Sequence, residues 1–529
     1  MGSSITGILD KRGRDVFRRI LSMLSATEHR GSANIGIAIM GKSVCETYPG
    51  KLDEVHLSGH IGIGVIWNGV EKKFGQANDS FHGILDGELY GSEEAKKCQS
   101  KKTSETRSSI ETMIHLLRNG ISEQLRWKDS ERLMHQKLRA VDGVFALAIL
   151  HENRIFVTRD IMGVKPLYIG EDENVIAFCS EKKGLWSIGL KKIRPLDPGS
   201  FAIIDRDNIH IFRGSWRFRV RETKLEESVS GLGFILRKAV EKRVEKHDPV
   251  GLLFSGGLDS TILAKIVKDS GKDLDLFCAG TGKGRDVVRA KRIADLLDLP
   301  LRIKKLTSSN IEHHLAEIVF GIETNDYKAI AIGIPVYFAG RLAKDHGIDT
   351  VLSGQGADEL FGGYARYLIT LKKKGYDGLQ KVLEQDVGKI AELNVHRDDH
   401  ASNSHGVQIQ LPYLDWNVVK FGHGISTKFK IRKRANKWSR KFVLRRLAEN
   451  MNLPKEVCWG PKVAMQYGSG SEKILKKIAK AKGFSKSFAK RHGYLNHIQL
   501  FFDCVAKQAG IPVKTQKLES IIRELDFAL

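Results

Sequence analysis

The chain has 529 residues, which is enough for two or three domains that each bury a core of their own. Hydrophobic residues make up 41% of it and only 11 residues are proline, so a disordered chain is excluded and an ordered globular protein is expected. The formal net charge of +24 predicts attraction to polyanions and to anionic ligands.

The cysteines and the apolar runs exclude further classes of protein. The six cysteines are scattered without Cys-x-x-Cys spacing, so neither a zinc site nor a disulfide framework is expected. This pattern fits a reducing, cytoplasmic location. The first residues carry no signal-peptide pattern, and no stretch of about 18 apolar residues predicts a membrane span.

Residues 1 to about 205 are expected to form an α+β unit that is rich in strands. Short apolar runs bounded by turns predict strands at Asn34–Met40, Val144–Leu150 and Arg154–Thr158. The helical spacing of apolar residues predicts helices at Val16–Ser25 and Ser109–Leu117. Strands and helices mixed in this way are typical of an α+β domain.

Beyond a charged linker near residues 213–225, strands and helices alternate from about residue 230. Strands are expected at Val250–Phe254, Leu274–Cys278 and Thr350–Leu352, each followed by a helical segment. Such alternation predicts a parallel sheet with helices on both faces, and ligands of such sheets bind at the carboxyl ends of the strands. From about residue 471 the chain is basic and expected to be helical.

The first of these strands leads directly into a glycine turn. Ser255, Gly256 and Gly257 follow the strand, and a helix is expected from Ser260 onward. Glycine lets the backbone approach an anion closely, and the start of a helix offers free N–H groups and a partial positive charge. The turn therefore predicts a phosphate cradle that carries its own acid, Asp259. No lysine follows the second glycine, which excludes the P-loop of NTPases.

A second strand, Thr350–Leu352, ends in a similar turn at Ser353–Tyr364. Two such turns on one sheet would place Asp259 and Asp358 around one metal-bound pyrophosphate. Mg²⁺ suits this arrangement, because it binds through one or two carboxylates and the phosphate oxygens. Taken alone, Asp358 is better explained as a turn or helix-cap carboxylate.

The densest run of cations lies between Lys428 and Arg446, with no acid among them. Phe429, Trp438 and Phe442 lie between the charges, as a surface that binds RNA or nucleotide phosphates would require. However, Trp438 and Phe442 are four residues apart, which equally suits the buried side of one solvated helix. We favour this helix over the nucleic-acid surface.

The two turns resemble those of ATP pyrophosphatases, which cleave ATP between its α and β phosphates. SGGLDS at 255–260, followed by SGQGADELFGGY at 353–364, looks like the synthetase domain of glutamine-hydrolysing asparagine synthetases and of the related β-lactam synthetases. Further segments resemble other motifs of this family: Leu411–Asp415, Trp459–Lys462 with Gln466–Gly470, and Phe277–Gly280. The resemblance implies an α/β parallel-sheet ATP pyrophosphatase domain of the adenine nucleotide alpha hydrolase-like class.

The resemblance also implies functions for individual residues. ATP and pyrophosphate would be bound by Leu253, Ser255, Gly256, Gly257, Asp259, Ser260, Ala279, Ser353 and Gly354. Asp259 and Asp358 would bind Mg²⁺, and Lys462 would neutralise the phosphates during adenylation. Gln355 occupies a catalytic position at which bacterial members have a glutamate, a proposed general base, and a neutral amide cannot accept that proton. Gln408 and Gln410 replace a family E-x-R run, which leaves the pocket for an acidic substrate open to question.

The first 200 residues resemble the N-terminal-nucleophile, class II glutamine amidotransferase-like domain of the same family, an α+β sandwich. The segments that carry this resemblance are Ser4–Ile8, Glu28–Gly31, Asp86–Tyr90, Arg159–Tyr168 and Ser180–Lys182. In that family a cysteine directly follows the initiator methionine, because its free α-amine activates the thiol. Gly2 stands there instead, and Ser3 occupies the position of the cysteine by motif alignment.

Other positions of this domain depart from the family in the same direction. Asp86, beside Gly87, replaces the asparagine of the oxyanion site and would place a negative charge where an oxyanion must form. Glu105 falls at the aspartate that binds the substrate amine, and Gly59–Ile63 lacks the arginine that binds the substrate carboxylate. We therefore expect a degenerate, inactive glutaminase domain.

These comparisons divide the chain into four expected segments. They are an inactive class II glutamine amidotransferase-like domain over 1–210, a linker over 211–229, an asparagine synthase-like ATP pyrophosphatase domain over 230–475, and a basic helical extension over 476–529. The resemblance implies an amide ligase that uses ATP and Mg²⁺ to adenylate a carboxylate, with aspartate the expected substrate. Ammonia, or glutamine through a separate glutaminase, would then displace AMP, and a homodimer is compatible with the sequence.

Three alternatives stay open. The first is an amide ligase that uses an amine substrate, as β-lactam synthetases do. The second is an amidotransferase that modifies RNA or tRNA; the net charge favours it, but the GADELFGGY motif and the segments Trp459–Lys462 and Gln466–Gly470 do not. The third is a non-catalytic paralogue, against which the presence of Asp259, Asp358 and Lys462 argues.

Overall fold

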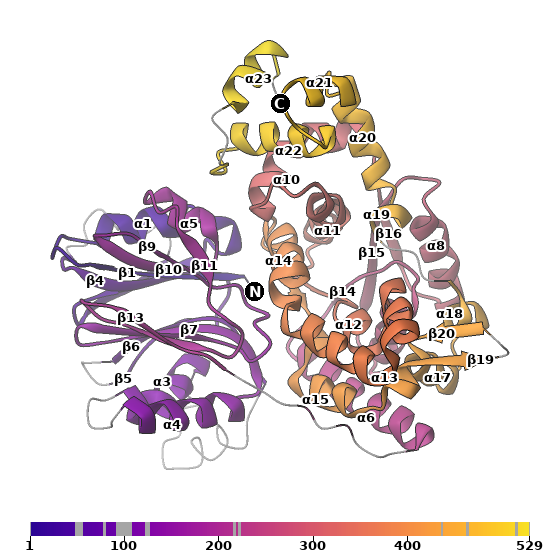
Figure 1. The fold of residues 1–529 in the computed structure, drawn as a ribbon. Helices are drawn as coiled ribbons and strands as arrows, with labels where there is room; N and C mark the ends of the chain where they lie inside the picture. Colours follow the sequence, from indigo (N-terminus) through magenta and orange to yellow (C-terminus); the bar gives the residue numbers. More distant parts are fainter. Residues whose placement is uncertain are drawn as a thin grey trace. The chain divides into compact units, whose positions relative to one another are not determined.

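A computed structural model of the chain describes residues 2–47, 57–77, 81–90, 108–121, 127–214, 218, 220, 224–434, 437–461, 465–513 and 517–527. The chain divides into two compact units, Met1–Arg217 and Phe218–Leu529 (Figure 1). Among the described residues, no helix is both long and apolar enough to span a lipid bilayer.

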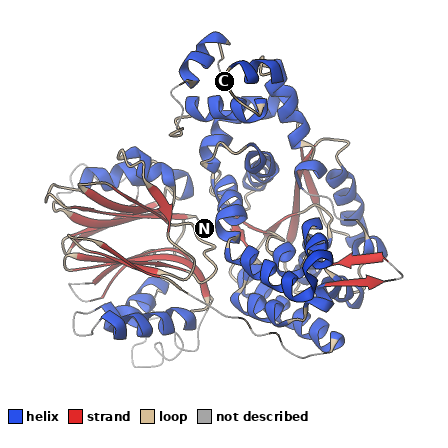
Figure 2. Cartoon of the chain, viewed as in Figure 1, coloured by secondary structure: helices blue, strands red, loops and turns tan. Residues whose placement is uncertain are grey.

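The first unit contains two antiparallel sheets with helices outside them (Figure 2). Its strands are β1 (Ser3–Asp10), β2 (Asn34–Ile39), β3 (Lys42–Thr47), β4 (Ile61–Trp67), β5 (Phe74–Ala77), β6 (Phe81–Leu89), β7 (Gly143–His151), β8 (Arg154–Arg159), β9 (Tyr168–Glu171), β10 (Val175–Cys179), β11 (Ile193–Pro195), β12 (Phe201–Ile204) and β13 (Ile209–Phe212). Their order is β11-β9-β10-β1-β4-β2-β3 in one sheet and β13-β12-β8-β7-β6-β5 in the other.

Alternating side chains bury both faces of these sheets. On β1, Ile5 packs into the core between the two sheets, whereas Ile8 packs on the opposite face. The outer faces are covered by α1 (Phe17–Ser25) and α5 (Lys182–Ser187) on one side, and by α3 (Ser109–Ile121) and α4 (Trp127–Ala140) on the other. The result confirms the predicted α+β sandwich, in which two sheets lie between two layers of helices.

The second unit is built on a five-stranded parallel sheet in the order β16-β15-β14-β17-β18. Its strands are β14 (Val250–Leu253), β15 (Leu274–Gly280), β16 (Leu301–Lys305), β17 (Thr350–Leu352) and β18 (Gln408–Gln410). This arrangement confirms the predicted parallel sheet. Because β14 lies between β15 and β17, the turns after β14 and β17 leave the same edge of the sheet side by side.

Helices surround this sheet (Figure 2). They are α6 (Leu225–Val244), α7 (Leu258–Asp269), α8 (Arg285–Leu297), α9 (Ser308–His313), α10 (Leu315–Ile322), α11 (Tyr327–Asp345), α12 (Ala357–Phe361), α13 (Ala365–Gly388), α14 (His396–Asn403), α15 (Trp416–Gly424), α16 (Thr427–Lys430), α17 (Phe442–Asn450), α18 (Lys455–Trp459), α19 (Met465–Gly468), α20 (Ser471–Ala481), α21 (Lys486–Arg491), α22 (His497–Gln508) and α23 (Leu518–Glu524). A π-helix (Ala391–Val395) precedes α14, and a 3-10 turn (Pro412–Leu414) follows β18. The last helices, α20 to α23, confirm the predicted helical character of the C-terminal segment.

The prediction of one helix through the basic run at 428–446 was wrong. The run contains the end of α16, the antiparallel strands β19 (Ile431–Arg434) and β20 (Lys437–Arg440), and the start of α17. Lys441 has a φ of +55°, a left-handed conformation that ends β20 and separates it from the helix. Trp438 packs against α13 and Phe442 contacts Trp459, so the two aromatic residues do not share one helix face.

A buried ion pair ties α6 to the turn after β18. The Asp415 carboxylate accepts a hydrogen bond of 2.8 Å from Arg243 and forms an ion pair of 2.5 Å with Lys242. The same carboxylate caps α15. Burial alone would raise the pKa of Asp415, but the two cations outweigh it and lower that pKa to about 2. Since this folded-state pKa lies below the unfolded value of about 3.9, the stabilisation is complete above that value and is lost as the pH falls.

We expect Asp415→Asn to lower the free energy of unfolding by about 2 kcal/mol at pH 7, because the cations lose their charged partner. The difference from the wild type should shrink by about half between pH 6 and pH 3. Urea unfolding across this pH range measures both effects. Asp377→Asn removes an exposed carboxylate of α13 and serves as the control. A difference that stays constant down to pH 3 would contradict the assigned cause.

Candidate active site

The turn after β14 is shaped by a close backbone approach. Gly256 has a φ of +65°, and a Cβ there would lie 2.8 Å from the carbonyl oxygen of Arg289. The Arg289 Nε donates a hydrogen bond of 2.9 Å to the Ser255 carbonyl and holds the turn in place. Helix α7 then begins at Leu258, so its first N–H groups and its partial positive charge face the space in front of the turn.

The turn after β17 touches the first turn. The Ser353 amide donates to the Gln410 carbonyl of β18 over 3.0 Å, which continues the sheet by one residue. A Cβ at Gly354 would lie 3.0 Å from the Asp259 Cβ and 3.3 Å from the Ser260 amide nitrogen. A side chain at this position would therefore push the two turns apart, and glycine allows them to meet.

Asp259 and Asp358 come together around one lysine. The Lys441 Nζ lies 2.6 Å from the Asp259 Oδ2 and 2.6 Å from the Asp358 Oδ1, and only 4% of its side chain is exposed. Burial lowers the pKa of Lys441, while the neighbouring carboxylates of Asp259 and Glu359 act in the opposite direction. The sequence had placed Lys441 in a solvated basic run; instead it is the counter-charge of the two predicted acids.

One cavity of about 530 Å³ lies in front of both turns. Every predicted site residue of this unit lines it except Lys462: Leu253, Ser255, Gly256, Gly257, Asp259, Ser260, Ala279, Ser353, Gly354, Gln355 and Asp358. The neighbouring Pro461 also lines the cavity, and Lys462 itself lies outside the described residues. Ser255 and Ser353 thus face the same space, as two turns acting on one ligand require.

The cavity has an apolar wall and a polar end. Phe277 and Ala279 of β15 and Pro335, Val336 and Ala339 of α11 supply the apolar wall. This wall lies beside the first turn, so it can receive a flat aromatic base while the phosphates lie against the turn. The cavity therefore matches the two halves of a nucleotide in chemistry.

The polar end contains residues that the sequence did not indicate. The Tyr364 hydroxyl and the Asn394 amide donate hydrogen bonds of 2.7 and 2.9 Å to the Glu359 Oε1, and the Arg397 Nη1 donates to the Asn394 Oδ1 over 3.1 Å. Tyr364, Asn394 and Arg397 line the cavity. Burial raises the pKa of Glu359. Asn394 belongs to the π-helix, an irregularity that periodicity cannot predict but that is frequent at functional sites.

The two carboxylates fit a magnesium ion. The Asp259 Oδ1 is buried and accepts no hydrogen bond from the described residues, so it keeps a lone pair for a further ligand. Carboxylate oxygens are the hard ligands that Mg²⁺ takes together with phosphate oxygens. In the described part of the chain no cluster of three or more His, Cys, Asp or Glu side chains has the geometry of a metal site. The carboxylates of Asp259 and Asp358 could therefore hold Mg²⁺ together with the phosphate oxygens of a ligand.

The predicted glutaminase position is a buried network of charges in the first unit. Ser3 and Asp86 are fully buried, and the Ser3 hydroxyl donates to the Asp86 Oδ1 over 2.8 Å. Lys165 and Arg30 lie 3.2 and 3.5 Å from the same carboxylate. Burial would raise the pKa of Asp86, but Lys165 and Arg30 outweigh it and lower that pKa. Asp86 is thus held in its charged form beside Ser3.

A second acid extends this network. Arg30 donates to the Glu181 Oε1 over 2.9 Å, and Lys183 lies 2.7 Å from the Glu181 Oε2. Glu181 is fully buried, yet His29, Lys183 and Arg30 hold its pKa well below the usual range. The backbone is equally tight, because a Cβ at Gly2 would lie 1.9 Å from the Arg30 carbonyl oxygen. Gly87 follows Asp86 with a φ of +121°, and Glu105 lies outside the described residues.

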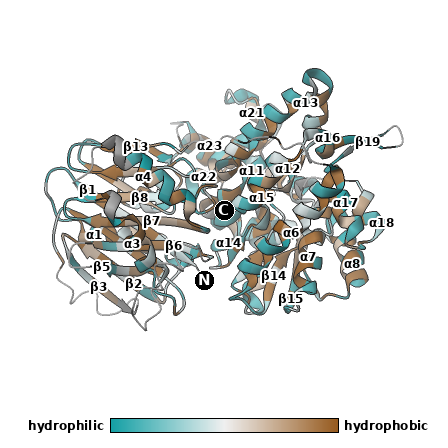
Figure 3. Cartoon of the chain, turned by 90° about the horizontal axis from the view of Figure 1, so that it is seen from below, coloured by the Kyte–Doolittle hydropathy of each residue, from teal (hydrophilic) through white to brown (hydrophobic). Residues whose placement is uncertain are grey.

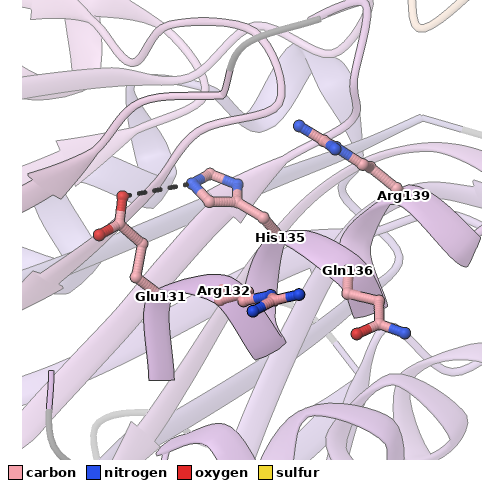
Figure 4. Close-up of a pocket in the computed structure, with 5 residues that line it drawn as sticks. All are labelled: Glu131, Arg132, His135, Gln136 and Arg139. Atoms are coloured by element: carbon pink, nitrogen blue, oxygen red, sulfur yellow. Dashed lines mark ion pairs between the residues drawn. The ribbon is translucent and has the colours of Figure 1, made fainter. Parts of the chain in front are cut away.

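Another hollow of the first unit lies along α4 (Figure 4). Its lining residues, Glu131, Arg132, His135, Gln136 and Arg139, all come from this one helix. The His135 ring lies 3.9 Å from the Glu131 carboxylate, and burial lowers the pKa of His135. The hollow contains none of the predicted site residues, so the cavity between the two turns is the candidate site.

Comparisons with known proteins identify the family. The model of the family described as asparagine synthase matches residues 232–377 and 370–510, and that of the glutamine amidotransferase domain matches residues 71–187. A protein of Methanocaldococcus jannaschii named putative asparagine synthetase (glutamine-hydrolyzing) 1 is 30% identical over 91% of this chain and 96% of its own length. A probable asparagine synthetase of Dictyostelium discoideum is 26% identical over 90% of this chain and 86% of its own length.

Among solved structures, the chain is similar to the glutamine phosphoribosylpyrophosphate amidotransferase of Bacillus subtilis, with a TM-score of 0.34 and 20% identity over 53% of this chain and 67% of that one. The family models together cover more than half of the chain, and the archaeal relative is matched over nearly all of both sequences. The chain therefore belongs to the asparagine synthetase family.

Proposed function

We propose that this protein is an ATP-dependent amide ligase that converts the side-chain carboxylate of aspartate to an amide. The observation that carries the proposal is the meeting of two glycine turns, with Asp259, Asp358 and Lys441, at one nucleotide-sized cavity. The relatives named asparagine synthetase support aspartate as the carboxylate. In this reaction a carboxylate oxygen attacks the α-phosphorus of ATP and pyrophosphate leaves.

The residues of the two turns would bind the leaving pyrophosphate. The backbone around Ser255 and Gly257 and the first turn of α7 present N–H groups to its oxygens, and such fixed donors stabilise the charge that develops there. Asp259 and Asp358 would hold Mg²⁺, which when bound neutralises phosphate charge. Lys441, already between the two acids, would turn its ammonium toward the phosphates, and Lys462 is proposed to act on the same phosphates.

The other end of the cavity would orient the acyl group. Arg397, Asn394 and Tyr364 are fixed by the buried Glu359, so their hydrogen-bond donors are already in position before a substrate binds. Gln355 also lines this cavity and can donate a hydrogen bond, but it cannot accept a proton as a general base would. Ammonia would then attack the acyl carbon, and AMP would leave with its oxygen.

The first unit is proposed not to supply that ammonia from glutamine. The Ser3 hydroxyl is buried and bonded to a charged carboxylate, and the Lys165 and Arg30 charges that could bind an anion are taken by Asp86 and Glu181. A developing oxyanion beside Asp86 would meet a negative charge instead of a donor. Free ammonia, or a separate glutaminase, is therefore the proposed nitrogen source.

The reaction is tested by pyrophosphate exchange into ATP with a panel of carboxylates. We expect exchange with aspartate, and we expect Asp358→Asn to lower its rate by about 100-fold or more, because the cation that balances the phosphates loses a ligand. Asp377→Asn, which removes an exposed carboxylate, should leave the rate unchanged. Exchange with another carboxylate but not with aspartate would refute the substrate, and no exchange with any carboxylate would refute the ligase.

The shared lysine gives a prediction that does not depend on turnover. Lys441→Met should lower the free energy of unfolding by about 3 kcal/mol, because two adjacent carboxylates lose their counter-charge. A divalent cation can then take that position, so 10 mM Mg²⁺ should raise the melting temperature of this variant by about 2 to 4 °C more than that of the wild type. Adding Asp358→Asn to the variant should remove this extra stabilisation. An equal effect of Mg²⁺ on all three proteins would contradict the proposed metal position.

The nitrogen source is tested by isotope labelling. With the purified protein alone, ¹⁵N from the amide of glutamine should not enter the product, whereas ¹⁵N-ammonium should enter it readily, because the Ser3 site lacks a usable nucleophile. Mass spectrometry of the product distinguishes the two. The ammonium reaction is the positive control for an active ligase, and incorporation from glutamine at a comparable rate would refute the inactive glutaminase.

A further inference from the structure

A ridge of cations projects from the second unit, outside the cavity. We define the basic ridge as Lys372, Lys373 and Lys374 of α13 together with Arg432, Lys433, Arg434 and Lys437 of the β19–β20 hairpin. All seven residues are exposed. Figures 1 and 3 show α13 beside this hairpin, which extends beyond the helices around it.

A small hydrophobic cluster fixes the two parts of the basic ridge to one another. Ile431 is fully buried among Leu371 and other side chains of α13, and Trp438 of β20 packs against the same cluster. Tyr376 follows the three lysines along the chain, and its hydroxyl donates a hydrogen bond of 3.4 Å to the Ile431 carbonyl. Buried contacts therefore hold the hairpin against α13. Lys433 lies over Trp438 on the hairpin face toward this cluster, whereas Arg432 and Arg434 lie on the other face, over Phe442 and Trp459.

Among the described residues, no carboxylate balances the positive charges of the basic ridge. None of its seven residues makes an ion pair with a carboxylate of the described chain, and Asp377, the nearest acid along α13, pairs with none of them. By contrast, the exposed Lys265 of α7 lies 2.6 Å from Asp269. Seven cations on two adjoining elements, without a carboxylate partner among the described residues, repel one another, and a ligand with closely spaced negative charges relieves that repulsion.

The chemistry of the basic ridge favours a phosphodiester chain. Of the large exposed hydrophobic residues of the described chain, none lies on the hairpin and one, Ile369, lies on α13 before the three lysines. A single apolar side chain falls short of the apolar face with which a helix binds a membrane surface. The Arg434 guanidinium lies 3.7 Å from the centre of the Trp459 ring, and the Lys433 ammonium 5.4 Å from that of Trp438. Because these rings are covered by cations, the basic ridge offers charge to phosphates rather than ring faces to bases.

We propose that the basic ridge binds the phosphate backbone of RNA, without sequence preference. Arginine and lysine on a projecting β-hairpin and an adjacent helix can follow successive phosphates, and the net charge of +24 adds long-range attraction. Strand β20 leads directly into Lys441, and Arg440 donates to the Gly363 carbonyl of the second turn. RNA on the basic ridge would thus lie beside the ligase cavity, which is a binding function beyond the amide ligation proposed above.

The proposal is tested by fluorescence polarisation of a 5′-fluorescein-labelled, unstructured 30-nucleotide RNA on the full chain. If about seven phosphates are contacted, the logarithm of the binding constant should fall with the logarithm of the NaCl concentration with a slope of about −5. Arg432→Gln/Lys433→Gln/Lys437→Gln and Lys372→Gln/Lys373→Gln/Lys374→Gln should each raise the Kd at least about tenfold and flatten the slope by about 2.

A matched variant distinguishes binding by the basic ridge from attraction by the net charge of the protein. Lys473→Gln/Lys477→Gln/Lys480→Gln also removes three exposed lysines, but from α20, and should leave the Kd within about twofold of the wild type. Melting temperatures and pyrophosphate exchange should be unchanged in all three variants, which excludes unfolding as the cause. Equal weakening by the α20 variant would overturn the proposal, as would wild-type affinity of the ridge variants. Tighter binding of poly-glutamate than of RNA would assign the surface to an acidic protein instead.

Discussion

Two carboxylates held side by side by glycine turns are the constraint on which the second unit depends. Gly354 lets the turn after β17 approach Asp259 to contact distance, and this brings Asp358 to the same point. Like charges this close repel, so the arrangement needs a cation. Lys441 supplies this cation within the protein. In the proposed ligase, a metal ion and the phosphates of ATP would take the place of Lys441 beside the two carboxylates.

The first unit also contains buried acids that cations of the protein neutralise. Asp86 and Glu181 are also buried acids, but Arg30, Lys165 and Lys183 saturate them, and the serine beside them is enclosed. Because these carboxylates already have cations of the protein as partners, removing one partner would leave a buried charge unpaired. The Ser3–Asp86 hydrogen bond of this network joins β1 of one sheet to β6 of the other.

Motifs and periodicity predicted the parts of the structure that depend on local chain conformation. Strands β14 and β17, the turns at Ser255 and Ser353 and the helix after the first turn follow from apolar runs that end in glycine. The parallel sheet then requires the two turns to share an edge, so their common cavity was predictable too. The polar end of the cavity was not, because Asn394 projects from a π-helix whose irregular repeat leaves no periodic signal, and Arg397 is positioned by it.

The basic run shows most clearly why counting charges does not locate them. Within a dozen residues, Lys430 is fully buried, with its pKa lowered to about 7 by burial, Lys433 is exposed on the hairpin, and Lys441 lies between two acids. Nothing in the local sequence separates these three environments, because each is set by what a distant segment brings to that position: α13 for the first two, and the two glycine turns for the third. A charged residue in a sequence must be neutralised or solvated, by water, by the protein or by a ligand. Which of these occurs is decided by the packing of segments that are distant in the sequence.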